Sequence, residues 1–349
     1  MDFAFSEEQE QLRSIAREFL ADAYPIEEVA RTADSPDGWD PSGWKALAEL
    51  GWLDAELGPL EHAVLLEESA AALLPAPLFS TLALALPAVQ DVAGRRLTFA
   101  WIEERRSEAL GSAVKVTSAT VDERGRVFGR KTLVPDASTV DGMVVVTRTS
   151  DGEPALALVD VGDGVTIEGH PTIDSTRRLG TVIFDGATGQ QLASGSDAVA
   201  HVQRITQHAL TGAACEAVGV AQRALDIAVE HARTREQFGR PIGSYQAISH
   251  RIADVYARVQ LARSLATWAA WSLTQNSDAA VPAAAAKSYA AEAAVAACES
   301  AIQVLGGIGF TWDHPVHRYY KRAQWLDAFA GDAARQRAAV AAALLDKPE

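Results

Sequence analysis

The sequence contains few cysteines and comparatively few basic residues, and each shortage excludes a class of protein. The only two cysteines, Cys215 and Cys298, lie in alanine-rich stretches without a CxxC or histidine-rich spacing. A disulfide framework or a metal site is therefore not expected, and both are predicted to be small core residues. Lysine and arginine total 31 against 46 acidic residues, which gives a formal net charge of −15. Such an acidic surface disfavours nucleic acid and anionic membranes as partners.

Long hydrophobic runs are also missing. The stretch from Leu73 to Val89 comes closest to the ~18 residues that suggest a membrane span, and three prolines interrupt it. The first residues, Met1–Glu8, are acidic, unlike the basic start of a signal peptide. We therefore expect a soluble, cytoplasmic protein. With 349 residues, 48% of them hydrophobic, the chain is long enough for two or three globular domains.

Helical periodicity marks the first part of the chain. Ser6 followed by Gln9 has the pattern of a capping box, and apolar residues then recur on one face up to Leu20. Further helices are expected around Trp44–Leu50, and from Ala63 to Leu74, where prolines end the pattern. We predict an N-terminal helical domain over residues 1–95.

Short β-branched runs replace this periodicity between residues 96 and 190. The runs predicted as strands are Val114–Thr117, Lys131–Val134, Met143–Val146, Ala155–Val159 and Thr181–Phe184. Asp-Gly pairs beginning at residues 151, 163 and 185 separate or bound several of them. No helical crossover interrupts them, which disfavours a Rossmann sheet. A small antiparallel β domain is predicted here.

The remaining part, residues 191–349, returns to helical composition. Four stretches are rich in alanine and leucine with few breakers: 198–233, 245–275, 279–305 and 330–345. Their length and composition are typical of a four-helix bundle. The predicted fold class is therefore α+β, with an N-terminal helical domain, a middle antiparallel β domain and a C-terminal four-helix bundle.

Two segments of the last region resemble the acyl-CoA dehydrogenase family. Within Ala217–Ile248 the sequence R-E-Q-F-G-R-P-I-G-S-Y-Q is similar to the family pattern R-x-Q-F-G-x-P-I-x-x-x-Q. Gln303–Phe310 reads Q-V-L-G-G-I-G-F, similar to Q-x-x-G-G-x-G-F. The resemblance implies the family's fold along the whole chain, with FAD at a dimer interface. There the β domain of one subunit holds the isoalloxazine ring, and the neighbour's C-terminal bundle contacts the adenosine diphosphate half.

The resemblance also implies roles for residues of the bundle. Arg235 would contact the FAD pyrophosphate, to which a guanidinium offers a fork of donors, and Phe238 would pack near adenine and ribose. Gln246 and Gln303 would donate amide hydrogen bonds, and a glycine pair would let the backbone approach the cofactor. The implied cofactor-binding residues are Arg235, Gln237, Phe238, Gln246, Gln303, Gly306 and Gly307.

Both positions at which the family places its catalytic base are alanine here. In the family's reaction a glutamate takes the α proton of an acyl thioester, and the flavin accepts a hydride from the β carbon. The usual glutamate position matches Ala330, in the segment F-A-G-D, and the alternative position matches Ala209. Neither side chain can take a proton. The remaining candidate bases are Asp332, and Glu216 at roughly 10 Å from Ala209 along a helix.

The residues that hold the flavin ring in the family are replaced as well. The family's T-E-P-x-A-G-S-D corresponds roughly to residues 101–106, W-I-E-E-R-R, which lack a Gly-Ser turn. The family's W-I-T or W-I-S corresponds to Leu133–Pro135, and Pro135 has neither an N–H nor a hydroxyl to offer. The half of the site offered to a neighbouring subunit is thus retained, while the half used by the chain itself is lost.

The favoured interpretation is a non-catalytic subunit that completes the FAD site of a catalytically complete partner. Residues 309–323 are similar to bacterial steroid-type members, which form α2β2 heterotetramers with one degenerate subunit type and act on bulky acyl-CoA substrates. One alternative is a complete homo-oligomeric acyl-CoA or acyl-carrier-protein dehydrogenase that uses Glu216 or Asp332. The other is a structural or regulatory homologue without flavin. The colour of the purified protein distinguishes these three interpretations.

Overall fold

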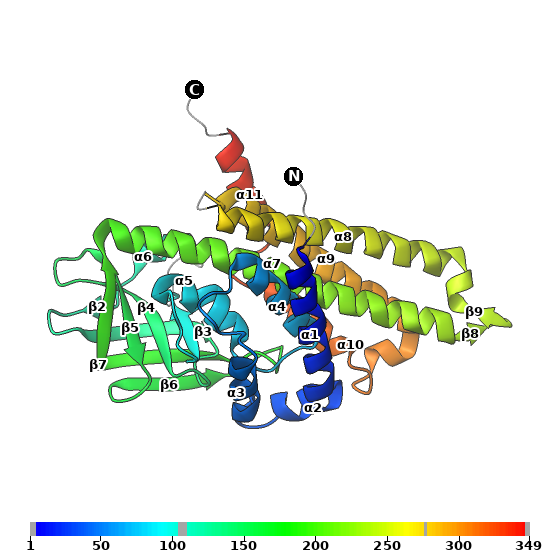
Figure 1. The fold of residues 1–349 in the computed structure, drawn as a ribbon, viewed down its shortest axis with the longest axis horizontal. Coiled ribbons are helices and arrows are strands. Elements are labelled where there is room, and N and C mark those ends of the chain that lie inside the picture. Colours follow the sequence, from blue (N-terminus) through cyan, green and yellow to red (C-terminus); the bar gives the residue numbers. More distant parts are fainter. Residues whose placement is uncertain (1–4, 104–109, 276–277, 346–349) are drawn as a thin grey trace. The chain divides into compact units, whose positions relative to one another are not determined.

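The chain folds into two compact units in a computed structural model that describes residues 5–103, 110–275 and 278–345 (Figure 1). The helical unit comprises Met1–Val29, Pro59–Leu74 and Leu210–Glu349, and the β unit comprises Ala30–Gly58 and Pro75–Ala209. The predicted combination of helices, a sheet and a further set of helices is confirmed. The division into three domains at residues 95 and 190 stays a prediction.

Two N-terminal helices belong to the helical unit. Helix α1, Glu7–Ala23, begins with the predicted capping box, in which Ser6 Oγ accepts the Gln9 N–H at 3.2 Å and Gln9 Oε1 accepts the Ser6 N–H at 3.0 Å. Helix α4, Pro59–Ala71, starts before the predicted Ala63 because proline is well tolerated in the first turn of a helix. It packs against α1, and Leu20 of α1 is buried.

The C-terminal helices form the larger part of the helical unit. They are α7 (Gly195–Thr234, shared with the β unit), α8 (Gln246–Thr274), α9 (Ala280–Leu305), α10 (Val316–Ala328) and α11 (Ala333–Leu345). The sequence did not predict α10, which lies between α9 and α11, while the other helices of this region occur in the predicted order. α9 contacts α8, α10 and α11. A Cβ on Gly219 of α7 would lie 2.0 Å from the carbonyl oxygen of Glu67 in α4, so the backbones of these two helices touch.

Helix α9 corrects one expectation about hydrophobic runs. Together with the residues up to Phe310 it is long and apolar enough to cross a membrane, judged by length and composition alone. Most of its alanines, together with Lys287 and Cys298, are buried within the helical unit, and packing against three neighbouring helices accounts for this composition. The stretch at 73–89 contains instead a π-helical turn, Ser80–Ala85, and α5, Leu86–Val89. Cys215 and Cys298 are buried and not disulfide-bonded, as predicted.

Among the described residues of the β unit, seven strands form one sheet. They are β1 (Leu97–Ala100), β2 (Thr120–Val121), β3 (Arg126–Pro135), β4 (Gly142–Arg148), β5 (Pro154–Asp160), β6 (Val165–His170) and β7 (Leu179–Ser194). The pairings of β3, β5 and β6 with β7 are antiparallel, as are β2–β3 and β4–β5, while β1 and β2 pair with β4 in parallel. The antiparallel prediction is therefore confirmed for most of the sheet. The predicted Asp-Gly turns have left-handed glycines at 152 and 164. The turn predicted at Asp185-Gly186 is wrong, because β7 continues through it to Ser194 with an irregularity in its pairing to β3.

Helices accompany the sheet, and one of them replaces a predicted strand. In the β unit, α3 spans Pro41–Glu49 and α6 spans Ala113–Val116, while α2, Ile26–Ala33, is divided between the two units. The strand prediction for Val114–Thr117 is therefore wrong. The Arg148 guanidinium donates to the carbonyl oxygens of Val114, Lys115 and Thr117, which occupies acceptors that a strand would need for its neighbour.

Candidate functional site

The sequence Gln237–Arg240 forms a tight hairpin between α7 and α8. Strands β8, Glu236–Gln237, and β9, Arg240–Pro241, pair around Phe238 and Gly239, whose φ angles of +53° and +77° suit a two-residue turn. The Tyr245 hydroxyl donates to the Gln237 carbonyl at 3.1 Å, and the Arg240 guanidinium lies 4.0 Å from the Tyr245 ring centre. The hairpin is thus fixed by its own side chains, while Phe238 remains 94% exposed.

A second short element contains the glycine pair. Residues Gly306–Phe310 form a 3₁₀ turn after α9, and Gly306, with φ +65°, ends that helix in the left-handed region. A Cβ on Gly309 would lie 2.8 Å from the Ile302 carbonyl oxygen, so packing within the chain requires that glycine. A Cβ on Gly306 or Gly307 would meet no described atom within 4 Å. The space beside this pair is open, as a backbone surface for a bound group requires.

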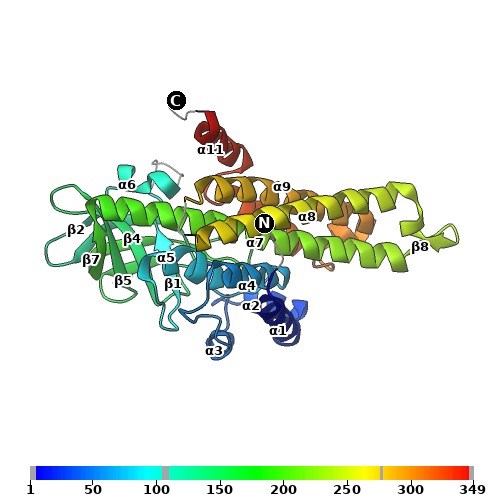
Figure 2. The same cartoon turned by 45° about the horizontal axis from the view of Figure 1, so that its top comes forward.

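The predicted cofactor residues gather at one end of the helical unit. The hairpin and the turn after α9 lie at the same end in both views (Figure 1 and Figure 2). Burial and the nearby charge of His231, on α7, lower the pKa of His314, which follows the 3₁₀ turn. Most of the predicted set is exposed there, namely Arg235, Gln237, Phe238, Gln246, Gln303 and Gly307, while Gly306 is half-buried. Their contacts with a cofactor stay a prediction.

The turn that holds Ala330 is tightly fixed, although its side chain cannot accept a proton. Ala330 has φ +54° and Gly331 has φ +99°. Lys287 Nζ donates to the carbonyl oxygens of Asp327 and Gly331, both at 2.6 Å, and Gln336 Nε2 donates to that of Ala330 at 2.9 Å. Burial lowers the pKa of Lys287 to about 8. These bonds stabilise a left-handed alanine, a conformation that otherwise costs ~1 kcal/mol or more.

The two candidate replacement bases are engaged elsewhere. Asp332 Oδ1 accepts the Arg335 N–H at 2.9 Å, which makes Asp332 the N-cap of α11. Glu216 is 2% exposed, and its Oε2 lies 3.9 Å from Nη1 of Arg322, which is 1% exposed. The Glu216 carboxylate thus faces a buried guanidinium rather than open space in which a substrate could lie. Ala209 is fully buried.

Restoring a glutamate at position 330 is therefore expected to leave the isolated chain inactive. A base alone supplies no hydride acceptor, and both must be positioned against the same substrate. We predict no acyl-CoA oxidation by Ala330→Glu in an assay with an artificial electron acceptor. Ala330→Gln is the matched control, because it has the same size without a base. Turnover by the glutamate variant above that of the glutamine variant would contradict the prediction.

The β-unit residues that match the family's ring site are occupied by contacts within the unit. Lys131 Nζ lies 2.7 Å from Glu103 Oε1, and that carboxylate also accepts from Thr117 and Ser118. Burial raises the pKa of Glu103, but Lys131 and the hydroxyl donors outweigh it and lower the pKa to about 2. The Pro135 carbonyl accepts the Thr98 hydroxyl at 2.7 Å. These groups do not fit a flavin ring, and Glu104, Arg105 and Arg106 lie outside the described residues.

Comparisons with known proteins agree with this architecture. The pattern that defines the acyl-CoA dehydrogenase C-terminal domain matches residues 200–345. Acyl-CoA dehydrogenase IpdE2 of Mycolicibacterium smegmatis is 34% identical over 91% of this chain and 93% of its own length. The chain belongs to the acyl-CoA dehydrogenase family, a family of oxidoreductases whose members use FAD.

Solved structures similar to this chain include one described as a complex. In the ChsE4–ChsE5 complex from Mycobacterium tuberculosis, the matching chain is 27% identical, with a TM-score of 0.87 and complete coverage of both chains. In a structure described as the Tcur3481–Tcur3483 steroid ACAD G363A variant, the identity is 26%, the TM-score 0.86 and the coverage 97% of this chain and 98% of that one.

Within the described residues, no group of three or more His, Cys, Asp or Glu side chains could hold a metal ion.

Proposed function

We propose that this chain is the non-catalytic subunit of an FAD-dependent acyl-CoA dehydrogenase that assembles as an α2β2 heterotetramer in the cytoplasm. Its role is to complete the FAD site of a catalytically complete partner. The observation that carries the proposal is the contrast between the two halves of the site. Alanine occupies both base positions, 209 and 330, while most of the predicted cofactor residues of the bundle are exposed and accessible to another molecule.

The helical unit supplies groups suited to the adenosine diphosphate half of FAD. Arg235 would hold the pyrophosphate, and Gln246 and Gln303 would donate amide hydrogen bonds from α8 and α9. The open space beside Gly306 and Gly307 supports a close backbone contact. Bound FAD supplies the hydride acceptor of the reaction. The partner would provide both the ring site and the glutamate, so this chain contributes binding free energy and orientation.

The relatives support a hetero-oligomer and a bulky substrate. One related structure is described as a complex of two different chains and another as a steroid dehydrogenase. A steroid side-chain acyl-CoA is therefore the substrate class we propose for the assembly. A complete homo-oligomeric enzyme is less consistent with the structure, because Glu216 pairs with Arg322 and Asp332 caps a helix.

The chain purified without a partner is expected to contain little FAD and to oxidise no acyl-CoA. The reason is that its ring-site positions are occupied by internal contacts of the β unit. The measurement is the flavin absorbance per chain and acyl-CoA-dependent dye reduction, for the chain alone and after co-expression with the neighbouring reading frame. Near-stoichiometric flavin with turnover in the chain alone would favour the homo-oligomeric enzyme. A complex that remains colourless would favour the homologue without flavin.

A further inference from the structure

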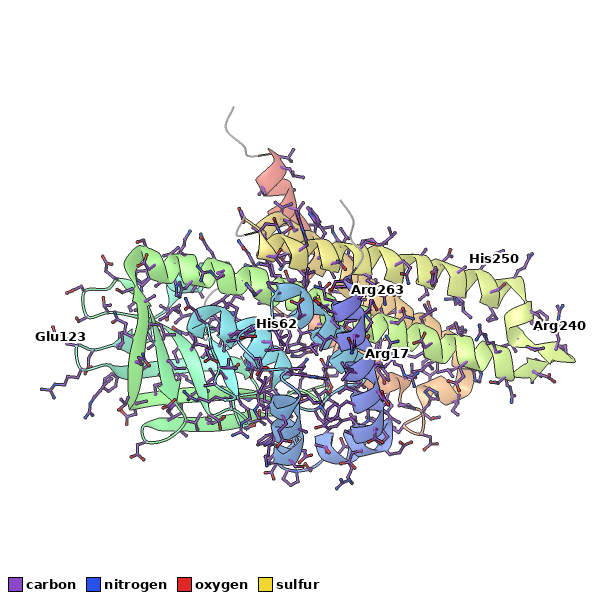
Figure 3. All side chains as sticks on the ribbon, in the orientation of Figure 1. Arg17, His62, Glu123, Arg240, His250 and Arg263 are labelled. Carbon is purple, nitrogen blue, oxygen red and sulfur yellow. The ribbon has the colours of Figure 1, made fainter. Side chains whose placement is uncertain are left out.

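A partly open hollow of about 830 Å³ lies in the helical unit. Its lining comes from α1, the start of α2, α4, α7, α8 and α10, so every lining residue belongs to this unit. Figure 3 shows two of the lining side chains, Arg17 on α1 and Arg263 on α8, in the same part of the unit. None of the predicted cofactor-binding residues lines the hollow. Its volume is that of a site for a small molecule.

Five charged side chains of the lining form one network. Arg17 donates to both oxygens of Glu68, at 2.8 and 3.0 Å, and Arg13 Nη1 donates to Glu68 Oε1 at 3.0 Å. Arg263 donates twice to Glu67 Oε1, at 3.0 and 3.1 Å, and Arg13 Nη1 lies 3.2 Å from Glu67 Oε2. Every carboxylate oxygen of the network therefore faces a guanidinium. Three arginines and two glutamates leave the network with a net charge of +1.

The arginines of the network have more donors than its carboxylates can accept. Within the part of the chain that the structure describes, Arg13 Nη2 and Arg17 Nη1 make no hydrogen bond. The Arg13 side chain is only 12% exposed, and the hollow that it lines is where it can meet an acceptor. Unused cationic donors of this kind favour an anionic ligand over a cationic one.

The remaining charges of the lining are exposed. They are Glu10, Arg223 and Asp226. Asp226 Oδ1 already accepts from Gln222 Nε2 at 2.8 Å, and Arg223 forms a hydrogen bond with the hydroxyl of Tyr319. Solvent and salt screen these charges more than those of the buried glutamates and Arg13. The charge that a ligand meets inside the hollow is therefore that of the network.

Another part of the lining is apolar. The end of α1 and the start of α2 contribute Leu20, Ala21, Tyr24, Pro25 and Ile26. Such a surface gains free energy by covering the apolar part of a ligand, while a few charged groups fix its orientation. The hollow thus offers an apolar wall together with cationic donors.

We propose that this hollow binds a small amphipathic carboxylic acid in its ionised form. The carboxylate lies against Arg13 and Arg17, where a planar guanidinium matches its two oxygens, and the apolar body lies against the end of α1. A single negative charge balances the +1 of the network. The site is independent of the proposed function, since it shares no residue with the predicted cofactor site.

Decanoate is the probe, and decyltrimethylammonium is its matched control, because it has the same alkyl chain with the opposite charge. Calorimetric titration of the full chain, alone or in its complex, should show one saturable site for decanoate and none for the cation. Arg17→Met should weaken decanoate binding about tenfold or more. The fold should tolerate this change, because the Arg17 side chain is 66% exposed and Glu68 keeps Arg13. Arg258→Met removes an exposed arginine of α8 outside the hollow and should change the dissociation constant by less than about twofold.

Ala21→Trp tests the same site without altering any charge. Ala21 is exposed on α1 and lines the hollow, so an indole there should fill the space and abolish decanoate binding while the far-ultraviolet circular dichroism stays that of wild type. Equal binding of decanoate and decyltrimethylammonium would overturn the proposal. Absence of decanoate binding to the wild type, or wild-type affinity in both Arg17→Met and Ala21→Trp, would overturn it as well.

Discussion

Arg322→Met is expected to lower the free energy of unfolding by about 3–5 kcal/mol. Arg322 and Glu216 are 1% and 2% exposed, and their charged groups lie 3.9 Å apart. Methionine fills much of the same space but leaves the Glu216 carboxylate buried without its guanidinium. The loss is the desolvation cost of a buried carboxylate that no longer faces this guanidinium, and that cost is larger than the net contribution of the pair to stability. Urea titration of the full chain or complex, followed by far-ultraviolet circular dichroism, gives the free energy.

Arg337→Met is the matched control for this experiment. The Arg337–Glu292 pair is closer, at 2.8 Å, but its side chains are 53% and 54% exposed. Solvent screens such a pair, so its loss should cost at most about 1 kcal/mol. Adding Glu216→Leu to Arg322→Met should recover much of the stability, because neither position of the pair then carries a buried charge. Equal losses in Arg322→Met and Arg337→Met would show that Glu216 reaches solvent, and would restore it as a candidate base.

Arg235→Ala in the complex should weaken FAD binding by roughly 10- to 150-fold. A charge-assisted hydrogen bond contributes about 1.5–3 kcal/mol, and each factor of ten in affinity corresponds to about 1.4 kcal/mol. Turnover should recover at excess FAD, because the proposed catalytic glutamate lies in the other chain. Arg235→Lys should be intermediate, since an ammonium keeps the charge but loses the planar fork. Fluorescence titration of FAD into the apo-complexes measures the effect.

Arg233→Ala controls for the general positive potential of the same helix end. Arg233 is exposed and lies in the last turn of α7, so its removal changes the net charge equally. It should change the FAD dissociation constant by a few-fold at most, in a manner that salt suppresses. If Arg235→Ala has the same dissociation constant as wild type, this chain's motif does not serve the partner's cofactor.

Local sequence patterns were sufficient to predict those helices that are stabilised by interactions between residues close together in the chain. The capping box at Ser6 and the alanine-rich helices could be predicted, because caps and 3.6-residue periodicity act within a few residues. The β-branched run at Val114–Thr117 was misassigned, because Arg148, far away in the sequence, occupies its carbonyl oxygens. Helix α10 was missed, since its many aromatic and basic residues obscure the apolar stripe.

The sequence motifs of the candidate site could be recognised in advance, but the contacts that residues of this region make within the chain could not. The motifs that contain Arg235 and Gly306 could be found from their resemblance to the family's sequence patterns. Lys287 could have been noticed as a single cation inside an alanine-rich helix, yet nothing near it indicates that it holds the turn at Ala330. The Glu216–Arg322 pair joins residues far apart in the chain, and only the folded structure shows which charges are buried together.

The contact between Gly219 and Glu67 has a consequence for how this family is detected. Gly219 lies inside the motif A-V-G-V-A-Q-R-A-L, but it serves the crossing of α7 over α4 rather than a cofactor. A subunit that lost all its chemistry would still need this glycine to fold. Part of the motif is therefore required for helix packing and would be retained in a subunit that has lost catalytic activity. A genome survey that counts such motifs will overestimate the number of enzymes. Counting the side chain at position 330 separately would correct the estimate.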